Sequence, residues 1–123
     1  MAVTHGTTAR NAIADTVTAL IDGGTGAGYL EFQTSGGTEV ATCPFSATAF
    51  GAASSGTCTA NAITDDTSAT GGTIAKAALK DGDAVSHIQC ACGTSGSDIN
   101  LSTLSITAGD TVSVTSLTYS APA

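Results

Sequence analysis

The sequence predicts a mainly β protein, an antiparallel β-sandwich of about seven strands preceded by one N-terminal α-helix. Three observations support this fold class. One run near the start has apolar residues at helical spacing. From Tyr29 onward, short alternating segments are separated by turn residues such as Asp81-Gly82-Asp83. Ala, Gly, Ser and Thr occupy 72 of the 123 positions, which suits closely packed strands but predicts a thin core.

We expect one domain in three parts, with residues 1–6 as an N-terminal arm, residues 7–22 as the helix and residues 23–123 as the β-sandwich. Thr7 or Thr8 is the predicted N-cap. Five apolar residues are spaced three or four apart along the helix, namely Ala9, Ile13, Val17, Leu20 and Ile21. Asp22-Gly23-Gly24 is expected to end it. The helix should lie over one sheet or across a subunit boundary.

Seven strands follow, at residues 29–34, 39–46, 55–64, 73–80, 84–93, 100–106 and 111–120. The first and second strands, and the fourth and fifth, are predicted to form hairpins. Residues 107–110 are expected to join the last two strands. The predicted core consists of Ile13, Val17, Leu20, Leu30, Phe32, Phe45, Ile74 or Leu79, Ile88, Leu104, Ile106, Val112 and Val114. Within residues 73–80, Lys76 and Lys80 share a face with Ile74, so Leu79 with Ala75 and Ala77 is the expected inward set.

Composition excludes several classes of partner. The formal net charge is −7, from ten acidic and three basic residues, which argues against binding nucleic acid. No apolar stretch approaches the length of a transmembrane helix, so no membrane association is expected. The start of the chain has no apolar region typical of a secretory signal. Only 22 residues are Leu, Ile, Val or Phe, so stability should depend on subunit contacts, a docking surface or disulfides.

The four cysteines, Cys43, Cys58, Cys90 and Cys92, are disulfide candidates. Zinc binding is disfavoured because the usual CxxC pairs are missing. Buried thiols and disulfides within or between chains stay open, and disulfides are favoured. Cys90 and Cys92 share a strand face with Ile88, and their Cα atoms should lie about 6.5–7 Å apart, which disfavours a bridge between those two. We hypothesise that at least one cysteine joins neighbouring subunits.

No residue is predicted to be catalytic, to bind a cofactor or to ligate a metal. His87 is expected at a surface or interface, and His5 in the N-terminal arm could touch a partner. The acidic residues of Asp65-Asp66 and of Asp81-Gly82-Asp83 suit turns better than Ca²⁺ binding or acid–base chemistry. The glycine-rich residues 23–28 follow a helix and lack the Lys-Ser/Thr of a phosphate loop, so they predict a plain connector.

Three stretches of the sequence carry a resemblance. HGTTARNAIADTVTALIDGGTGAG followed by YLEFQTSGGTEVATCPFS, together with TSATGGTIAKA and ITAGDTVSVTSLTYSAPA, resembles small virion proteins encoded by tailed phages and prophages. The likeness extends over nearly the whole chain and lies in the general composition and order of the segments, not in a catalytic motif. It implies a capsid decoration, or cement, protein. Such proteins are oligomers, commonly trimers, that bind the major capsid protein on the outer shell of a virion assembled in the host cytoplasm.

The resemblance transfers no active-site residue, and the four cysteines depart from the small apolar residues expected at such positions. A collar, tail or fibre component of the phage is the nearest alternative, and copy number separates it from decoration. A host-glycan-binding β-sandwich module is a second alternative, which requires exposed aromatic side chains. An enzyme is not expected; that interpretation would require a pocket of perturbed carboxylates around Asp65, Asp66 and Asp81.

Overall fold

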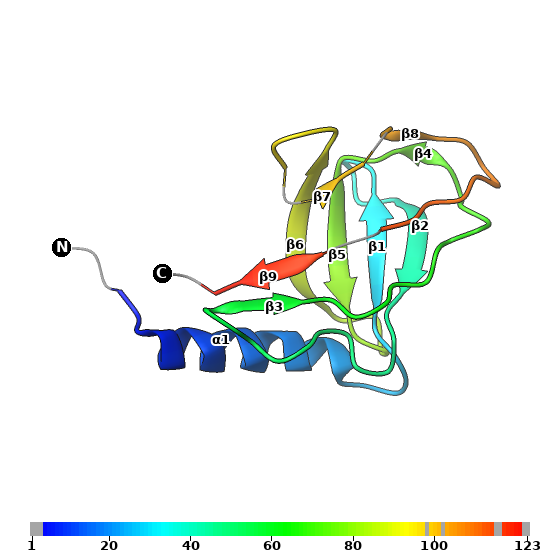
Figure 1. Cartoon of the computed structure of the whole chain (residues 1–123). Coiled ribbons are helices and arrows are strands. Elements are labelled where there is room, and N and C mark those ends of the chain that lie inside the picture. The colour runs from blue at the N-terminus through cyan, green and yellow to red at the C-terminus, as the bar shows by residue number, and fades with distance from the viewer. Residues whose placement is uncertain (1–3, 98, 102, 115–116, 122–123) are drawn as a thin grey trace.

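The computed structural model describes residues 4–97, 99–101, 103–114 and 117–121. The coarse prediction is confirmed, since this part of the chain is mainly β with one helix (Figure 1). The elements are α1 (Thr7–Ala19), the 3₁₀ turn η1 (Leu20–Asp22), β1 (Tyr29–Gln33), β2 (Glu39–Pro44), β3 (Thr57–Thr59), β4 (Gly72–Thr73), β5 (Lys76–Lys80), β6 (Ser86–Gly93), β7 (Ile99–Asn100), β8 (Ser105–Ile106) and β9 (Thr118–Ser120). Figure 1 shows α1 along the base of the molecule, beside β3 and β9, with the larger sheet rising above one end of it.

The helix ends where the sequence predicts, because η1 stops at Asp22 and Gly23 turns to an extended conformation. The predicted threonine cap is wrong. Gly6 is the N-cap, and its carbonyl accepts the N–H of Arg10 at 2.9 Å. Thr7 and Thr8 therefore already lie inside the helix, whose first turn has no side-chain cap.

The main sheet has the strand order β2-β1-β5-β6-β7. The first four strands pair antiparallel, and β7 lies parallel to the end of β6. Both hairpins predicted here are confirmed. At the first turn the N–H of Thr34 donates to the Thr38 carbonyl at 2.9 Å, and at the second the N–H of Asp81 donates to the Val85 carbonyl at 3.0 Å.

The predicted sandwich of about seven strands is not confirmed. The described residues of the predicted strands 55–64, 100–106 and 111–120 form short segments, and the described parts of the last two do not pair with each other. Instead β9 pairs with β3 and β8 pairs with β4. Small side chains supply few cross-strand contacts, so local pattern does not determine which partner each strand takes. Residues 102 and 115–116 of these predicted strands lie outside the described part.

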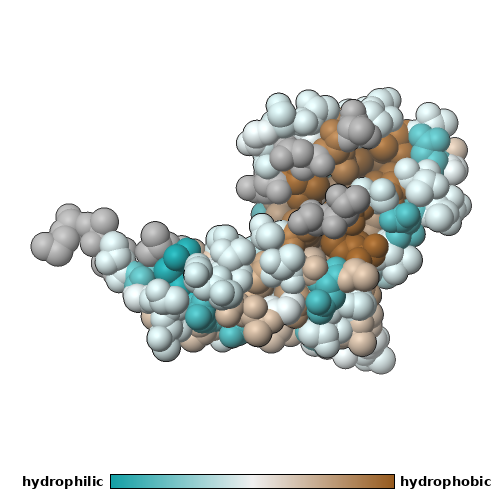
Figure 2. All heavy atoms as spheres, in the orientation of Figure 1, coloured by the Kyte–Doolittle hydropathy of each residue, from teal (hydrophilic) through white to brown (hydrophobic). Residues whose placement is uncertain are grey.

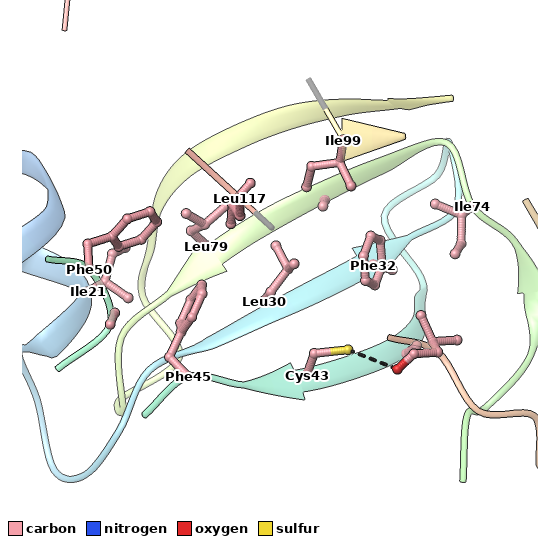
Figure 3. Packing of buried hydrophobic residues seen from close by; sticks show 14 of the residues in the cluster. Ile21, Leu30, Phe32, Cys43, Phe45, Phe50, Ile74, Leu79, Ile99 and Leu117 are labelled. Atoms are coloured by element: carbon pink, nitrogen blue, oxygen red, sulfur yellow. Dashed lines mark hydrogen bonds between the residues drawn. The ribbon is translucent and has the colours of Figure 1, made fainter. Parts of the chain in front are cut away.

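The core lies on one face of the main sheet (Figure 3). Leu30 and Phe32 of β1 are fully buried there, and Leu79 of the neighbouring strand is 1% exposed. Phe45 and Phe50 close one end, with ring centroids 5.7 Å apart. Alternation along β1 places Glu31 on the opposite face of the sheet, where it forms an ion pair with Lys80 at 3.0 Å.

The core prediction is right for the main sheet and only partly right for the helix, where Ile13 packs against the core but Leu20 does not. Buried as predicted are Leu30, Phe32, Phe45, Ile74, Leu79, Ala77 and Val112, whereas Ala75 is exposed. Ile74 and Leu79 are both buried because Ile74 precedes β5 and does not follow its alternation. Half-buried are Ile13, Val17, Ile88, Leu104, Ile106 and Val114. Leu20 is 46% exposed, while Ile21, Val40 and Leu117, which the predicted core omits, are buried.

Candidate functional site

Two acidic side chains of the helix segment bind the loop between β2 and β3. Asp15 accepts the N–H of Ala53 and Asp22 accepts the N–H of Ala49, both at 2.8 Å. This loop has little regular structure, so its backbone donors need partners from elsewhere. The helix supplies them with carboxylates, which form stronger hydrogen bonds than neutral acceptors.

The start of the helix makes the same kind of contact. The Asn11 side-chain oxygen accepts the N–H of Gly56 at 2.7 Å. The Arg10 guanidinium donates to the carbonyl of Ala121 at 3.1 Å and to that of Ser55 at 3.4 Å. Polar side chains spaced along one side of the helix therefore tie it to the loop and to the end of β9.

This docking leaves part of the apolar side of the helix at the surface, since Leu20 is 46% exposed and Val17 half-buried, whereas Ile13 packs against the core. The residues of α1 and η1 that are buried are Ala14, Thr18 and Ile21. Successive residues of a helix are rotated by about 100°. Ile13, Val17 and Leu20 therefore point about 100° away from the buried residues around the helix axis. A shallow groove of about 300 Å³ on this side of the helix is lined by Ala12, Ile13, Thr16 and Val17.

A second apolar surface lies over the core side of the main sheet. Figure 2 shows it as a broad brown field in the region where Figure 1 places β5 and β7. Half-buried apolar side chains that pack against the core in the sheet and the C-terminal segments are Ile88, Cys90, Cys92, Leu101, Leu104, Ile106, Val114 and Tyr119. We call this set the front apolar face. A cavity of about 400 Å³ opens within it, lined by Ile88, Gln89, Cys90, Thr118, Tyr119 and Ser120.

The acidic turns use their carboxylates on the backbone. Asp66 accepts the N–H groups of Thr42 at 2.8 Å and Ser68 at 2.9 Å. Asp81 accepts those of Asp83 and Val85 at 2.9 and 3.0 Å. These contacts support the interpretation of both clusters as turn-forming residues. In the described part of the chain, no group of three or more His, Cys, Asp or Glu side chains is arranged to hold a metal ion.

The glycine-rich connector, residues 23–28, packs against the same turn. The N–H of Thr25 donates to Asp83 at 3.1 Å, and the N–H of Gly82 donates to the Gly23 carbonyl at 3.2 Å. The Asp83 carboxylate therefore accepts a backbone N–H group that, in a phosphate loop, would donate to the bound phosphate. The contacts support the interpretation of these residues as a structural connector.

His87 lies next to Asp81, a pairing that sequence reasoning missed. The His87 Nε2 and Asp81 Oδ2 atoms are 2.9 Å apart, and both side chains are largely covered. The hydrogen bond from His87, followed by that from the Val85 N–H, holds the pKa of Asp81 below its usual value. The pair joins the two sides of the β5–β6 turn. The sequence signal for it is that Asp81 and His87 are six residues apart, on either side of a predicted turn.

Acid should therefore weaken the fold through Asp81. Below the usual aspartate pKa of about 3.9, the unfolded chain takes up a proton at this carboxyl while the folded chain does so only at lower pH. The stability that the charged carboxylate contributes is present above that value and is lost as pH falls through the folded-state pKa. We expect Asp81→Asn and His87→Gln each to reduce the loss of stability between roughly pH 5 and pH 2. Urea unfolding of both variants and of the unmodified chain over that range checks this, and identical pH profiles would contradict it.

The cysteines form two groups. The described residues include all four, and none is in a disulfide. Cys43 and Cys58 are fully buried, and burial raises the pKa of both thiols. The Cys43 thiol contacts the Val112 carbonyl oxygen at 3.5 Å. The Cys58 sulfur lies 3.7 Å from the Thr18 hydroxyl oxygen and 3.7 Å from the Asp15 carboxylate, both on the helix. Cys90 and Cys92 are half-buried on the front apolar face, on the same side of β6 as Ile88, as predicted.

Thiol alkylation should distinguish the two groups. We expect iodoacetamide to modify Cys90 and Cys92 in the folded chain, and Cys43 and Cys58 only after unfolding, since the thiolate must be both formed and accessible. Mass spectrometry of peptides from native and urea-treated samples measures this directly. Rapid native modification of Cys43 would show that β2 is more open than the structure describes.

The remaining residues that the sequence analysis considered lie partly at the surface and partly in the core. His5 is exposed ahead of the helix, and Asp65 is exposed between β3 and β4. Phe32, Phe45 and Phe50 are buried, whereas Tyr29 and Tyr119 are half-buried and Tyr119 lines the cavity on the front apolar face. The three buried phenylalanines do not offer the exposed aromatic faces that the glycan-binding alternative needs.

The comparisons with known proteins give no relative. No protein-family model matches the chain, and neither a curated protein nor a solved structure matches it. In the part of the chain that the structure describes, no helix has the length and apolar character needed to cross a bilayer.

Proposed function

We propose that this chain is a structural virion protein of the capsid decoration, or cement, type, and that it acts without catalysis. In this proposal, homo-oligomers, with a trimer favoured, sit on the outer capsid surface of a phage assembled in the host cytoplasm. They stabilise the shell by bridging neighbouring copies of the major capsid protein. The resemblance of the quoted segments to small phage virion proteins motivates the proposal.

The front apolar face is the observation that supports it best. Apolar area removed from water contributes about 25 cal/mol per Å², and a standard protein interface covers about 800 Å² per partner. A chain with so few large side chains still leaves several of them half-covered on one face (Figure 2). Such a face favours binding to another protein, and weak contacts repeated over a closed shell add together.

Two finer points belong to the same proposal. The ribbons β3–β9 and β4–β8 form a second layer over the main sheet, completing a β-sandwich; the burial of Cys58 and Leu117 in the shared core supports this. Cys90 or Cys92 joins neighbouring subunits once dissolved oxygen, after release from the cell, accepts the two electrons of disulfide formation. Non-reducing gels of released particles that show only monomer would exclude the cross-link.

Copy number and position on the particle test the role. We expect density for this chain on the outside of the shell, with hundreds of copies per particle. Roughly a dozen copies at one vertex, or density along the tail, would overturn decoration and favour a collar, tail or fibre component.

A matched pair of variants tests the front apolar face. We expect Leu101→Glu to lower binding to particles that lack the protein, and Thr111→Glu, which adds the same charge at an exposed position outside this face, to leave binding unchanged. Circular dichroism of both variants confirms that the fold is kept. Equal binding by both would remove the front apolar face from the proposal.

A further inference from the structure

We propose that Cys90 and Cys92 together bind one copper(I) ion, in a two-coordinate site built on a single strand. The two thiols lie on the same side of β6, separated by one residue, and neither is in a disulfide. Thiolate sulfur is a soft ligand and prefers a soft cation such as Cu(I) to a hard one. The site goes beyond the proposed decoration role and does not depend on it. It requires both thiols reduced, the state of the chain before the proposed cross-link forms.

The spacing of the two thiols suits an ion better than a disulfide. Residues two apart on a strand are separated by about 6.5–7 Å. A disulfide needs Cβ atoms about 3.8 Å apart, with one sulfur–sulfur bond of about 2.05 Å between the sulfurs. Two collinear metal–sulfur bonds, each about 2.3 Å long as in zinc–thiolate sites, replace that bond by a link of about 4.6 Å. The required Cβ separation then rises to about 6.3 Å, which is close to the spacing on the strand.

The sheet holds the thiols at this spacing. Cys90 is in register with Ala77 of β5, and the N–H of Cys92 donates to the Ala75 carbonyl at 3.3 Å. On the other side of β6, Cys92 is in register with Ile99 of β7. The register shift between β5 and β6 lies at the other end of the pair, near the turn, so the segment that carries the thiols is regular. The thiols are therefore positioned before the ion binds, which reduces the entropy lost on binding.

The surroundings of the thiols are apolar and open at one point. Cys90 and Cys92 pack against the core, whose nearest members in register are Ala77, 1% exposed, and Ile99, 4% exposed. An apolar shell of this kind limits the access of solvent to a bound metal. Cys90 also lines the cavity of about 400 Å³ on the front apolar face, together with Tyr119. This cavity provides the entry path that a metal site requires.

The number of ligands selects the ion. A structural zinc site needs four protein ligands, and a catalytic one needs three. Among the residues that the structure describes, no third His, Cys, Asp or Glu side chain is grouped with the two thiols. Copper(I) has a filled d shell and accepts two collinear sulfur ligands, so Cys90 and Cys92 complete its coordination. Cys43 and Cys58 are fully buried in the core and are not part of the site.

Anaerobic titration of the reduced chain with Cu(I), in competition with a coloured Cu(I) chelator, tests the proposal. We expect one ion per chain, bound with release of protons from the thiols. Cys90→Ser and Cys92→Ser should each lower the affinity more than about 100-fold, since loss of a ligand costs more than loss of an outer partner. Gln89→Ser, an exposed position on the same strand, is the matched control and should leave the affinity unchanged. Failure of the unmodified chain to take up the ion, or binding that survives in both cysteine variants, would overturn the site.

A displaced thiol tests the spacing itself. The double variant Ala91→Cys with Cys92→Ser keeps two neighbouring thiols but places them on opposite faces of β6. Ala91 is exposed, so the fold should be kept, which circular dichroism checks. We expect this variant to bind Cu(I) as weakly as Cys92→Ser alone.

X-ray absorption of the loaded, unmodified chain tests the coordination number and should show two sulfur neighbours at the metal. A third sulfur neighbour, or full affinity in the variant with the displaced thiol, would overturn the two-coordinate site. All of these measurements use the isolated chain. Their failure would leave capsid binding through the front apolar face to be judged by its own experiment.

Discussion

Phe32→Ala is expected to lower the free energy of unfolding by about 3–5 kcal/mol. Phe32 is fully buried on β1, the strand between β2 and β5. Its partners in register on the two neighbouring strands are Ala41 and Ala77. Because both are alanines, neither can move a longer side chain into the space that the ring leaves, and most of the cavity should persist.

The size of this effect follows from the composition. Domains of this size are typically stable by about 5–15 kcal/mol, so one such cavity removes a large part of the total. Urea unfolding followed by circular dichroism measures the loss. Phe32→Leu is the matched control, because it keeps most of the volume and should cost only about 1 kcal/mol. Equal stability of the alanine and leucine variants would show that β1 can repack and that the core is less dependent on Phe32 than its burial indicates.

The sequence predicted the main sheet well for a local physical reason. Leu30 and Phe32 alternate with polar residues, and the turns after Gln33 and Lys80 contain glycine or aspartate. The apolar–polar alternation and the turn residues then lie within one short segment, and both predict the same hairpin. The pairings of β3 with β9 and of β4 with β8 join segments that are far apart in the sequence. Their strands are two or three residues long, too short for a periodic pattern to identify.

The helix was predicted in the right place, but its inward side was predicted only in part. Hydrophobic spacing points to Ile13, Val17, Leu20 and Ile21. The structure buries Ile21 together with Ala14 and packs Ile13 against the core, but leaves Leu20 46% exposed. The deciding factor is the backbone of the loop between β2 and β3, whose N–H groups need acceptors. A hydropathy pattern gives no information about this need for hydrogen-bond acceptors.

Gly28→Ala is the second change expected to have a large effect, with a loss of about 3 kcal/mol of stability. A Cβ atom at this position would lie 2.5 Å from the carbonyl oxygens of both Ile21 and Lys80. The Gly28 carbonyl also accepts the N–H of Phe45 at 2.9 Å. The residue is held between η1 and β5, so relief would require one of two backbone segments to move.

The position of this contact makes the cost larger than that of an ordinary loop substitution. Ile21 is fully buried, and the end of β5 pairs with Tyr29 next to the substituted residue. A shift of η1 would therefore disturb the helix, the main sheet and the core together. Gly36→Ala is the matched control, since its Cβ would meet nothing closer than 3.9 Å and it should change stability by no more than about 0.5 kcal/mol. If thermal and urea unfolding gave the two variants equal stability, the helix would be attached to the sheet far less closely than these contacts require.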